Sequence, residues 1–287
     1  LQLNENDLKK NLLPTPRTFW SLTKSAIYGN KNQLTLSNNN IQGDLEKRLQ
    51  LSVKQQMISD VPLGAFLSGG IDSSTIVAMM QSQSIHPIKT FTIGFNDDSF
   101  NEAKYAKKIS KHLGTDHTEL YCASKTALDV IPKLPTMYDE PFSDSSQIPS
   151  FLVSQLAKNH VKVALSGDGG DELFCGYNRY ISTNNLSQKF NLIPVSLRNF
   201  LAYILKSLSS NNSNNLFNFL PSLNQHNNLG HKIYKGSNAL EARSLSDLYY
   251  ILSSHWLNPT EVVINSKEPG TFLTKFKPEL SNFNNHQ

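Results

Sequence analysis

The stretch Ser68–Ser74, with the sequence SGGIDSS, constrains the fold of this chain more than any other feature. It follows an apolar run, residues 61–67, and precedes a second apolar run, residues 75–80. That order predicts a buried strand, a glycine turn and then a helix. Such a turn directs free backbone N–H groups at one point, at the positive end of the helix dipole, where an anion can bind.

The residue types in this loop indicate which anion it binds. Glycines let the backbone approach an anion closely, and serine hydroxyls add hydrogen-bond donors. Asp72 implies Mg²⁺, because its carboxylate repels phosphates unless a cation lies between them. The loop lacks the Gly-Lys-Ser/Thr ending of a Walker loop and the G-x-G-x-x-G pattern of a dinucleotide loop. A plain surface turn is the alternative, but the flanking strand and helix favour a pyrophosphate or triphosphate site.

A second loop repeats this arrangement. Residues 161–165 form a short buried-strand pattern that runs into Ser166–Phe174, with the sequence SGDGGDELF. The alternative interpretation is a flexible acidic turn. In an open parallel sheet, however, ligands bind beyond the carboxyl ends of the strands. We therefore expect both loops to face one triphosphate, with Asp72 and Asp171 sharing the metal.

Strand and helix patterns alternate through the first part of the chain. Strands are expected at 61–67, 88–95, 117–122 and 161–165. Helices are expected at 44–56, 101–112 (ended by Gly114), 125–131, 146–158 and from about 171. This alternation predicts an α/β fold with a doubly wound parallel sheet. After residue 180 the strand patterns stop, and helices are expected at 194–208, 229–240 and 246–256, with a flexible loop at 209–215.

Together the two loops resemble the synthetase domain of glutamine-dependent asparagine synthetases. The first matches the S-G-G-x-D-S loop (PP-loop) of the wider ATP-pyrophosphatase superfamily, whose fold is adenine nucleotide alpha hydrolase-like. The second is narrower and is similar to asparagine synthetases and their β-lactam synthetase relatives. Further matching segments lie at 91–95, 102–103, 112–117, 139–142 and 144–149. The resemblance is strong from about Gln42 to Tyr180 and weaker from there to Trp256.

The resemblance implies a two-step reaction. ATP adenylates the side-chain carboxylate of aspartate and pyrophosphate is released; ammonia then displaces AMP to give asparagine. ATP and Mg²⁺ are the implied cofactors. Aspartate and ammonia are the implied substrates, and the ammonia comes from glutamine through a glutaminase domain that this chain lacks. The resemblance leaves the oligomeric state open, a homodimer included.

The resemblance also assigns roles residue by residue. The pyrophosphate contacts are Ser68, Gly69, Gly70, Asp72, Ser73 and Ser74. The adenosine contacts are Leu67, Ile93, Ser166 and Gly167. Asp72 and Asp171 hold the metal. Asp168 stands where most members carry a glutamate associated with adenylation, and it keeps the charge on a side chain that is one methylene shorter. Candidate aspartate contacts are Ser145, Ser146 and Gln147, for which a helix N-cap is the alternative role.

The same resemblance suggests how the chain is organised. Residues 1–40 are expected to be a linker or the tail of a preceding glutaminase domain. Residues 41–180 form the synthetase core, and residues 181–287 form a helical extension that is incomplete. The segment 240–243 (LEAR) is similar to a later family motif, but Ser244-Leu245-Ser246-Asp247 follows without the family's proline. We interpret it as the start of a helix with a serine cap.

Composition excludes several classes of protein. The net charge is +4 and the sequence pI is near 8.9, but the lysines are scattered, so we expect no nucleic-acid binding. No apolar run approaches the roughly 18 residues of a membrane span. The two cysteines, Cys122 and Cys175, form neither a disulfide framework nor a metal-binding spacing, which favours the cytoplasm.

Two alternatives to asparagine synthesis stay open at this point. The first is an amidotransferase for another carboxylate, such as a sugar acid or a β-lactam precursor, because the ATP loops are shared among these enzymes. The second is a nucleotide-binding module without catalysis. Asp168 in place of glutamate is the feature that favours this second alternative.

Overall fold

The computed structural model describes residues 17–34, 38–95, 101–140, 144–210, 229–254 and 256–267. The chain divides into two compact units. We call Thr35–Gly176 the sheet unit, and Leu1–Leu34 together with Tyr177–Gln287 the helical unit.

The sheet unit contains a parallel sheet, as the sequence predicts. Its strands are β1 (Leu63–Phe66), β2 (Lys89–Phe95), β3 (Asp116–Cys122) and β4 (Val163–Leu165), in the order β3-β2-β1-β4. All three pairings are parallel. The chain moves from β1 out to β3 and then returns past β1 to β4. With right-handed crossovers, this reversal places helices on both faces of the sheet.

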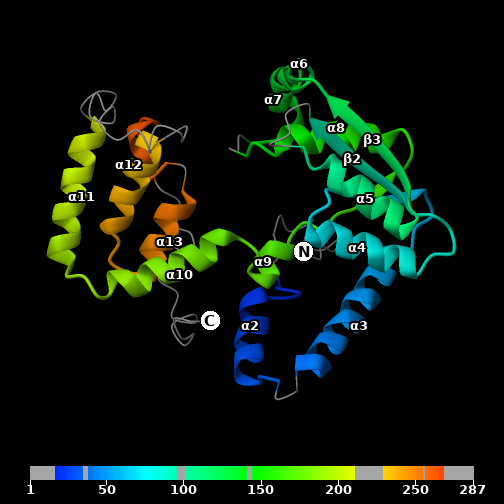
Figure 1. Cartoon of the computed structure of the whole chain (residues 1–287), viewed down its shortest axis with the longest axis horizontal. Coiled ribbons are helices and arrows are strands. Elements are labelled where there is room, and N and C mark those ends of the chain that lie inside the picture. The colour runs from blue at the N-terminus through cyan, green and yellow to red at the C-terminus, as the bar shows by residue number, and fades with distance from the viewer. Residues whose placement is uncertain are drawn as a thin grey trace, which may run out of the picture. The chain divides into compact units, whose positions relative to one another are not determined.

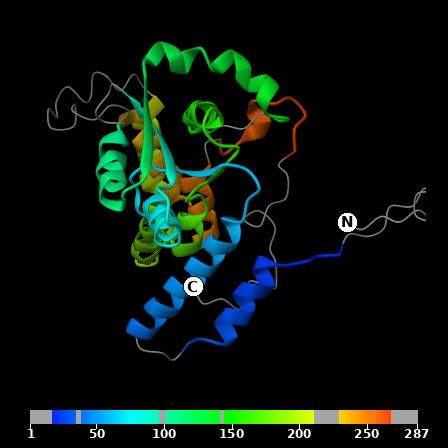
Figure 2. The same ribbon diagram turned by 90° about the vertical axis from the view of Figure 1, so that its right-hand side faces the viewer.

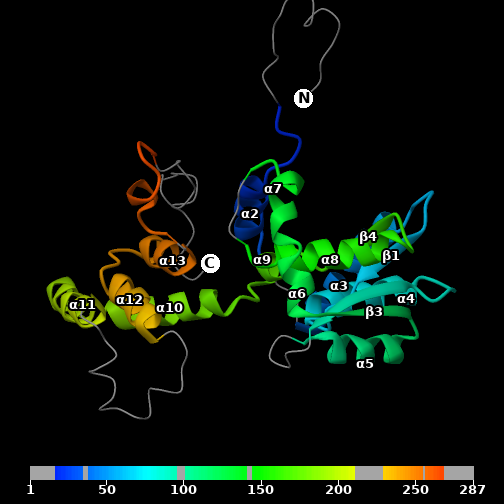
Figure 3. The ribbon, with the colours of Figure 1, turned by 90° about the horizontal axis from the view of Figure 1, so that it is seen from above.

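Helices cover the two faces of the sheet as that topology requires. On one face lie α3 (Asn38–Gln56), α4 (Ile71–Ser82) and α5 (Ala103–Leu113), with α3 packed beside α4 (Figures 1 and 2). On the other face lies α8 (Gln147–Lys158), so that α5 and α8 both contact β2 from opposite sides (Figure 3). The expected helix and strand bounds are confirmed to within a few residues, except that α3 begins earlier than residue 44.

The pleat of β1 divides its side chains between these two faces. Ala65 and Leu67 pack in the core that α4 and α5 cover, whereas Phe66 packs with Phe91 and Ala157 against α8. Because successive residues of a strand point to opposite faces, this alternation fixes which residues at the end of β1 can face α8.

Shorter elements complete the sheet unit. They are α6 (Ser124–Leu128), the 3₁₀ helix η2 (Ile131–Lys133), α7 (Leu134–Met137) and α9 (Gly170–Phe174). Gly114 ends α5 in the left-handed conformation, with φ of +73°, which confirms the predicted stop. Residues 141–143, which include part of the matching segment 139–142, lie outside the described residues.

The described part of the helical unit contains only helices. They are α2 (Leu22–Lys31), α10 (Asn178–Phe190), α11 (Val195–Ser210), α12 (Leu229–Leu240), α13 (Leu245–Ser253) and the 3₁₀ helix η5 (Pro259–Glu261). Within this unit α12 packs between α11 and α13, and α10 runs across them (Figure 1). Among the described residues, no helix has both the length and the apolarity that a membrane span needs.

The structure differs from the sequence prediction in one segment of this unit and contains an unpredicted helix in another. Residues 1–40 show weak patterning, yet α2 forms within them, because Ser21 caps it by accepting a hydrogen bond from the Lys24 N–H at 3.3 Å. None of its residues is buried, so no apolar stripe marks it in the sequence. Residues 209 and 210 belong to α11, and the rest of the expected loop 209–215 lies outside the described residues. The serine cap is confirmed: Ser244 Oγ accepts from the Asp247 N–H at 3.0 Å.

A buried arginine joins α11 to the end of α12. Arg198 is 6% exposed, and its Nη1 donates to the carbonyl oxygens of Ala242 at 2.7 Å and Leu240 at 3.2 Å. These carbonyls lie at the C-terminal end of α12, where a cation is favourable. The guanidinium also stacks over the Phe190 ring, 5.3 Å from its centroid.

We expect Arg198→Met to lower the free energy of unfolding by about 1.5–3 kcal/mol, because methionine keeps the stem but loses both charge-assisted hydrogen bonds. Urea titration followed by circular dichroism measures the change. The control is Arg179→Met, since Arg179 is exposed. An equal shift in both variants would show that the two carbonyl contacts of Arg198 contribute nothing.

A buried polar network links β2 to β3. Thr90 Oγ1 lies 2.8 Å from Nδ1 of His117 and 3.0 Å from Oγ1 of Thr115. Nε2 of His117 is buried and has no hydrogen-bond partner among the described residues. Burial lowers the pKa of His117 below its usual value, although nearby Glu119 acts in the opposite direction. The charged imidazolium would place an N–H at Nε2 without an acceptor.

Stability should therefore depend on pH through His117. Because the pKa is lowered by folding, the unfolded chain takes up the proton first as the pH falls through about 6.5. The contribution of His117 to the free energy of unfolding is then complete above that pH. It declines below that pH until His117 is protonated in the folded protein too. We expect the urea midpoint of His117→Asn to change less between about pH 7 and pH 5 than the urea midpoint of the parent protein does. Parallel pH profiles in the two proteins would contradict this role.

Candidate nucleotide site

The two glycine loops meet because their strands are neighbours. β1 pairs with β4 in parallel register, Leu63 with Val163 and Ala65 with Leu165, so both loops leave the same edge of the sheet. The chain reverses its winding direction between these two strands, and this switch point is where open α/β sheets bind ligands. Residues 68–70 and 166–170 therefore face each other at the start of α4.

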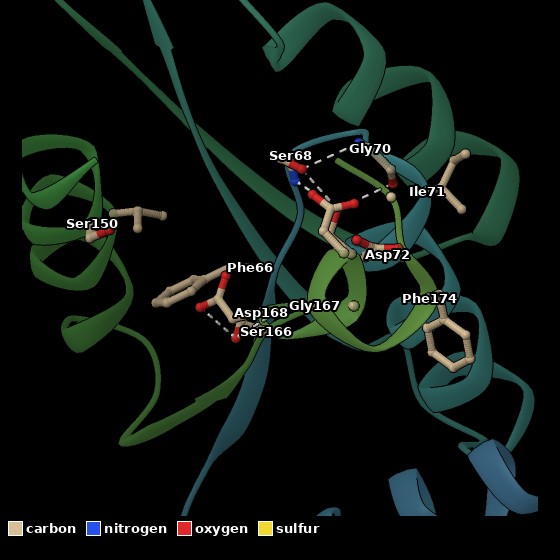
Figure 4. Close-up of a pocket in the computed structure, with 15 residues that line it drawn as sticks. Phe66, Ser68, Gly70, Ile71, Asp72, Ser150, Ser166, Gly167, Asp168 and Phe174 are labelled. Atoms are coloured by element: carbon tan, nitrogen blue, oxygen red, sulfur yellow. Dashed lines mark hydrogen bonds between the residues drawn. The ribbon is translucent and has the colours of Figure 1, made fainter. Parts of the chain in front are cut away.

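The serines of the first loop form hydrogen bonds within the loop and fix its shape. Ser68 Oγ lies 2.9 Å from Ser73 Oγ and accepts from the Gly70 N–H at 3.2 Å (Figure 4). Gly69 has φ of +89°, and a Cβ there would lie 2.7 Å from the Ala106 nitrogen. No side chain caps α4, so the N–H groups of its first turn, residues 71–73, point out of the helix without intrahelical acceptors. The loop can thus donate several hydrogen bonds to one anion.

The second loop approaches the first turn of α4 as closely as glycine allows. A Cβ on Gly167 would lie 2.6 Å from the Ser73 nitrogen and 2.8 Å from the Asp72 carbonyl carbon. A Cβ on Gly170 would lie 2.5 Å from Cγ of Asp72. Since no other residue lacks a Cβ, glycine at these positions is what brings the two loops together.

The loops enclose a cavity of about 690 Å³, within the range of small-molecule and cofactor sites. Its lining includes many of the predicted site residues: Ser68, Gly70, Asp72, Ser73, Ser166, Gly167, Asp168 and Asp171. The opposite wall comes from α8 through Ser150 and Val153. Phe66 lies between Ser150 and the second loop (Figure 4). The cavity therefore extends from the start of α4 to the face of the sheet that α8 covers.

Carboxylates dominate the charge of this cavity. Asp72, Asp168 and Asp171 all line it, and no Lys, Arg or His is among the described residues that do. Asp168 is held by its own loop, because Ser166 Oγ donates to its Oδ2 at 3.0 Å (Figure 4). An anionic ligand would need a cation here. The donor set suits Mg²⁺, which binds through one or two carboxylates together with substrate phosphates. No group of three or more metal-binding side chains occurs in the described residues.

Several predicted residues do not line the cavity. The side chain of Leu67 is 1% exposed and packs in the core, and Ile93 packs beside Cys122 and Leu152. Gly69 and Ser74 lie in the first loop and the first turn but outside the lining; Ser74 Oγ donates to the Gly70 carbonyl at 2.6 Å. The roles given to these four residues stay predictions.

The three candidate aspartate contacts also lie outside the lining. Ser145 and Ser146 are exposed at the start of α8, and Gln147 is half-buried. Ser146 occupies the N-cap position, but its side chain makes no capping hydrogen bond. The Ser146 N–H instead donates to Asp144 Oδ1 at 2.8 Å. Neither interpretation of these residues is therefore established.

Sequence reasoning missed the cavity wall formed by Phe66, Ser150 and Val153, and it gave no role to Phe174 at the end of the second loop. The pleat of β1 could have identified Phe66, because it faces α8 while its neighbours Ala65 and Leu67 do not. Ser150 and Val153 are three apart on α8 and so share a face, but nothing in the sequence shows which face meets the loops.

Comparison with known proteins places this site in a family. The model of the asparagine synthase family matches residues 44–282. The chain is 42% identical over 154 residues to asparagine synthetase [glutamine-hydrolyzing] 1 of Bacillus subtilis, covering 53% of this chain and 24% of that relative. It is 43% identical over 138 residues to putative asparagine synthetase [glutamine-hydrolyzing] 2 of Methanocaldococcus jannaschii, covering 48% and 27%.

A more distant relative is asparagine synthetase B [glutamine-hydrolyzing] of Escherichia coli, 32% identical over 152 residues, or 47% of this chain and 27% of the relative. The matched part thus corresponds to about a quarter of the length of these relatives. The family model, by contrast, covers most of the chain and includes both loops of the cavity. The chain therefore belongs to the asparagine synthase family.

Proposed function

We propose that this chain provides the ATP-binding site of an enzyme that amidates aspartate to asparagine. The observation that carries the proposal is the convergence of two glycine loops on the first turn of α4, in a chain of the asparagine synthase family. Free N–H groups there suit an oligophosphate. The acidic lining explains why the nucleotide would enter with Mg²⁺.

The proposed reaction has two displacements. In the first, a side-chain carboxylate oxygen of aspartate attacks the α-phosphorus of ATP, and the bond to the bridging oxygen breaks so that pyrophosphate leaves with the electron pair. In the second, the nitrogen of ammonia attacks the carbonyl carbon of β-aspartyl-AMP. AMP departs with the electrons of its C–O bond, and the ammonia nitrogen loses a proton to leave asparagine.

The residues of the cavity would serve the first displacement. The N–H groups of residues 71–73, with Ser68, Gly69, Gly70, Ser73 and Ser74 around them, would stabilise the charge that develops on pyrophosphate. Asp72 and Asp171 would hold Mg²⁺, which neutralises phosphate charge when bound. We assign adenosine contacts to Leu67, Ile93, Ser166 and Gly167, and aspartate contacts to Ser145, Ser146 and Gln147. In the second displacement, Asp168 would accept the proton that the ammonia nitrogen loses.

The names of the relatives suggest a source for the ammonia. Their printed names describe glutamine-hydrolysing enzymes, so we propose that ammonia reaches this site from glutamine by way of a glutaminase domain. In that arrangement residues 1–40 connect to the glutaminase domain, 41–180 form the synthetase core and 181–287 extend it. We place the reaction in the cytoplasm, on a protein that can form a homodimer.

Pyrophosphate release from Mg–ATP, with and without aspartate, tests the proposal. It is measured both in this chain and in the chain extended to its full reading frame. We expect release that depends on aspartate. Release that depends on another acid, with none from aspartate, would assign the site to a different carboxylate. Binding of ATP without any release in either version would make it a non-catalytic nucleotide site.

Asp168→Glu is expected to raise the rate of asparagine formation from aspartate, Mg–ATP and ammonia, because a proton is lost in the second displacement. The Ser166 bond holds the Asp168 carboxylate against its own loop, and one more methylene would extend it further into the cavity. A positioned proton acceptor contributes about 10²–10⁴-fold, so we expect an increase of up to about 100-fold. An unchanged rate, with ATP still bound, would show that the length of this side chain does not limit the reaction. Asp168→Asn, which removes the charge at equal length, is the control.

A further inference from the structure

A second cavity, of about 180 Å³, lies entirely within the helical unit. One face of α12, the chain that follows α13, and η5 surround it. Its principal side chains are Tyr234, Lys235, Asn238, Ser254, Trp256 and Glu261. The volume is below the range of about 300–1,000 Å³ for drug-sized ligands, so an occupant would be a smaller molecule.

Asn238 supplies a hydrogen-bond donor that the described protein does not use. Its side chain is 5% exposed, and its Nδ2 has no hydrogen-bond partner among the described residues. Buried amide groups are nearly always paired, because an unpaired one has lost its water without gaining a partner. A ligand oxygen in the cavity would satisfy this donor.

Lys235 and Glu261 bring opposite charges to the same cavity without pairing. In the described part of the chain neither forms an ion pair, with the other or with any other residue. The Lys235 ammonium donates to the Leu252 carbonyl at 3.5 Å, a long contact that leaves other donors free. Glu261 is oriented by Asn258, whose Nδ2 donates to its Oε1 at 2.9 Å. A cation and an anion are thus both presented to one small space.

A purely structural role explains only one of these groups. Lys235 contacts a carbonyl near the C-terminal end of α13, where a cation is favourable. That role does not account for the unpaired amide of Asn238, and it leaves the exposed carboxylate of Glu261 available to a ligand. The aromatic rings of Tyr234 and Trp256 add apolar surface beside these polar groups.

We propose that this cavity binds a small zwitterion of the α-amino acid class. Lys235 and Asn238 contact its carboxylate, and Glu261 contacts its ammonium group. Trp256 forms part of the wall. This site lies apart from the nucleotide cavity in its residues, and it does not depend on the reaction proposed for that cavity.

Tryptophan fluorescence tests the proposal directly. The chain contains two tryptophans, Trp20 and Trp256, so that Trp20→Phe leaves a single reporter in the cavity wall. Titration of this variant with L-asparagine, without ATP, should give a saturable change in emission below about 10 mM. Acetate and protonated methylamine should give none at equal concentrations, because each carries only one of the two charges. The absence of a saturable change with L-asparagine, or an equal change with acetate, would overturn the proposal.

Variants of the charged residues locate the response. In the Trp20→Phe background, Lys235→Met and Glu261→Gln should each raise the half-saturating concentration about tenfold or more, as expected for loss of a charge-assisted hydrogen bond. Lys189→Met is the matched control, since Lys189 is exposed in the same unit and does not line the cavity. If Lys235→Met and Glu261→Gln bind as the control does, the emission change arises elsewhere and the proposal fails.

Discussion

Asp72→Asn should abolish the gain in ATP binding that Mg²⁺ provides. With Mg²⁺ present we expect affinity to fall by about 100-fold or more, beyond the 10–100-fold typical of losing a group that only supports a metal ligand. With EDTA in place of Mg²⁺ we expect the opposite order. The variant should then bind ATP at least as well as the parent protein, because it lacks the carboxylate that repels the phosphates.

Equilibrium binding of ATP under both conditions measures this reversal without requiring catalysis. Asp60→Asn is the matched control, because Asp60 is exposed, lies in the sheet unit and does not line the cavity. Its affinity for ATP should match that of the parent protein in Mg²⁺ and in EDTA. If Asp72→Asn retained full Mg²⁺-dependent binding, the assignment of Asp72 as a metal ligand would be refuted.

Gly167→Ala should separate the two loops. The added Cβ would meet the Ser73 nitrogen and the Asp72 carbonyl carbon, at 2.6 and 2.8 Å. Both are backbone atoms, so no side-chain rotation can relieve the contact. We expect a loss of about 1–3 kcal/mol from the free energy of unfolding, as for other overpacked sites. Since the first turn of α4 must move away from the second loop, ATP affinity should also fall, by about tenfold or more.

Gly43→Ala is the control, because it shows what a glycine-to-alanine change does to stability where the added Cβ meets no other atom. Gly43 lies inside α3, and a Cβ there would have no atom within 4 Å. Alanine should stabilise that helix by about 0.5–1 kcal/mol and leave ATP binding unchanged. Urea midpoints and ATP binding are measured for both variants. Normal ATP affinity in Gly167→Ala would mean that the loops need not touch for the nucleotide to bind.

The parallel sheet was predictable because its signals are local. β1 and β4 are short apolar runs, and Gly114 stops α5 where the pattern ends. The pairing of β1 with β4 joins segments about 100 residues apart, and the sequence suggests it only through the likeness of their two loops. Helix α2 went unpredicted because it buries nothing and depends on a single serine cap.

The sequence identified the cavity residues that lie in the two loops, but it did not identify those that form the opposite wall. The residues of the two loops that line the cavity stand in recognisable motifs, whereas Phe66, Ser150 and Val153 do not. Leu67 shows why a motif is not sufficient. It directly precedes the first loop, but the pleat turns its side chain into the core, while Phe66, one residue earlier, reaches the cavity. A displacement of one residue along a strand exchanges the two faces.

The order of the strands bears on how the site appears during synthesis. β1, β2 and β3 are consecutive neighbours and can pair as the chain leaves the ribosome, since domains form from the N-terminal side as they emerge. The first loop would then exist on a nascent chain that still lacks β4. Only when residues 163–170 have emerged can the second loop close over α4. A nucleotide that binds between the loops would bind only the four-stranded sheet. It would therefore stabilise that sheet over its three-stranded precursor, at the last step in the folding of this unit.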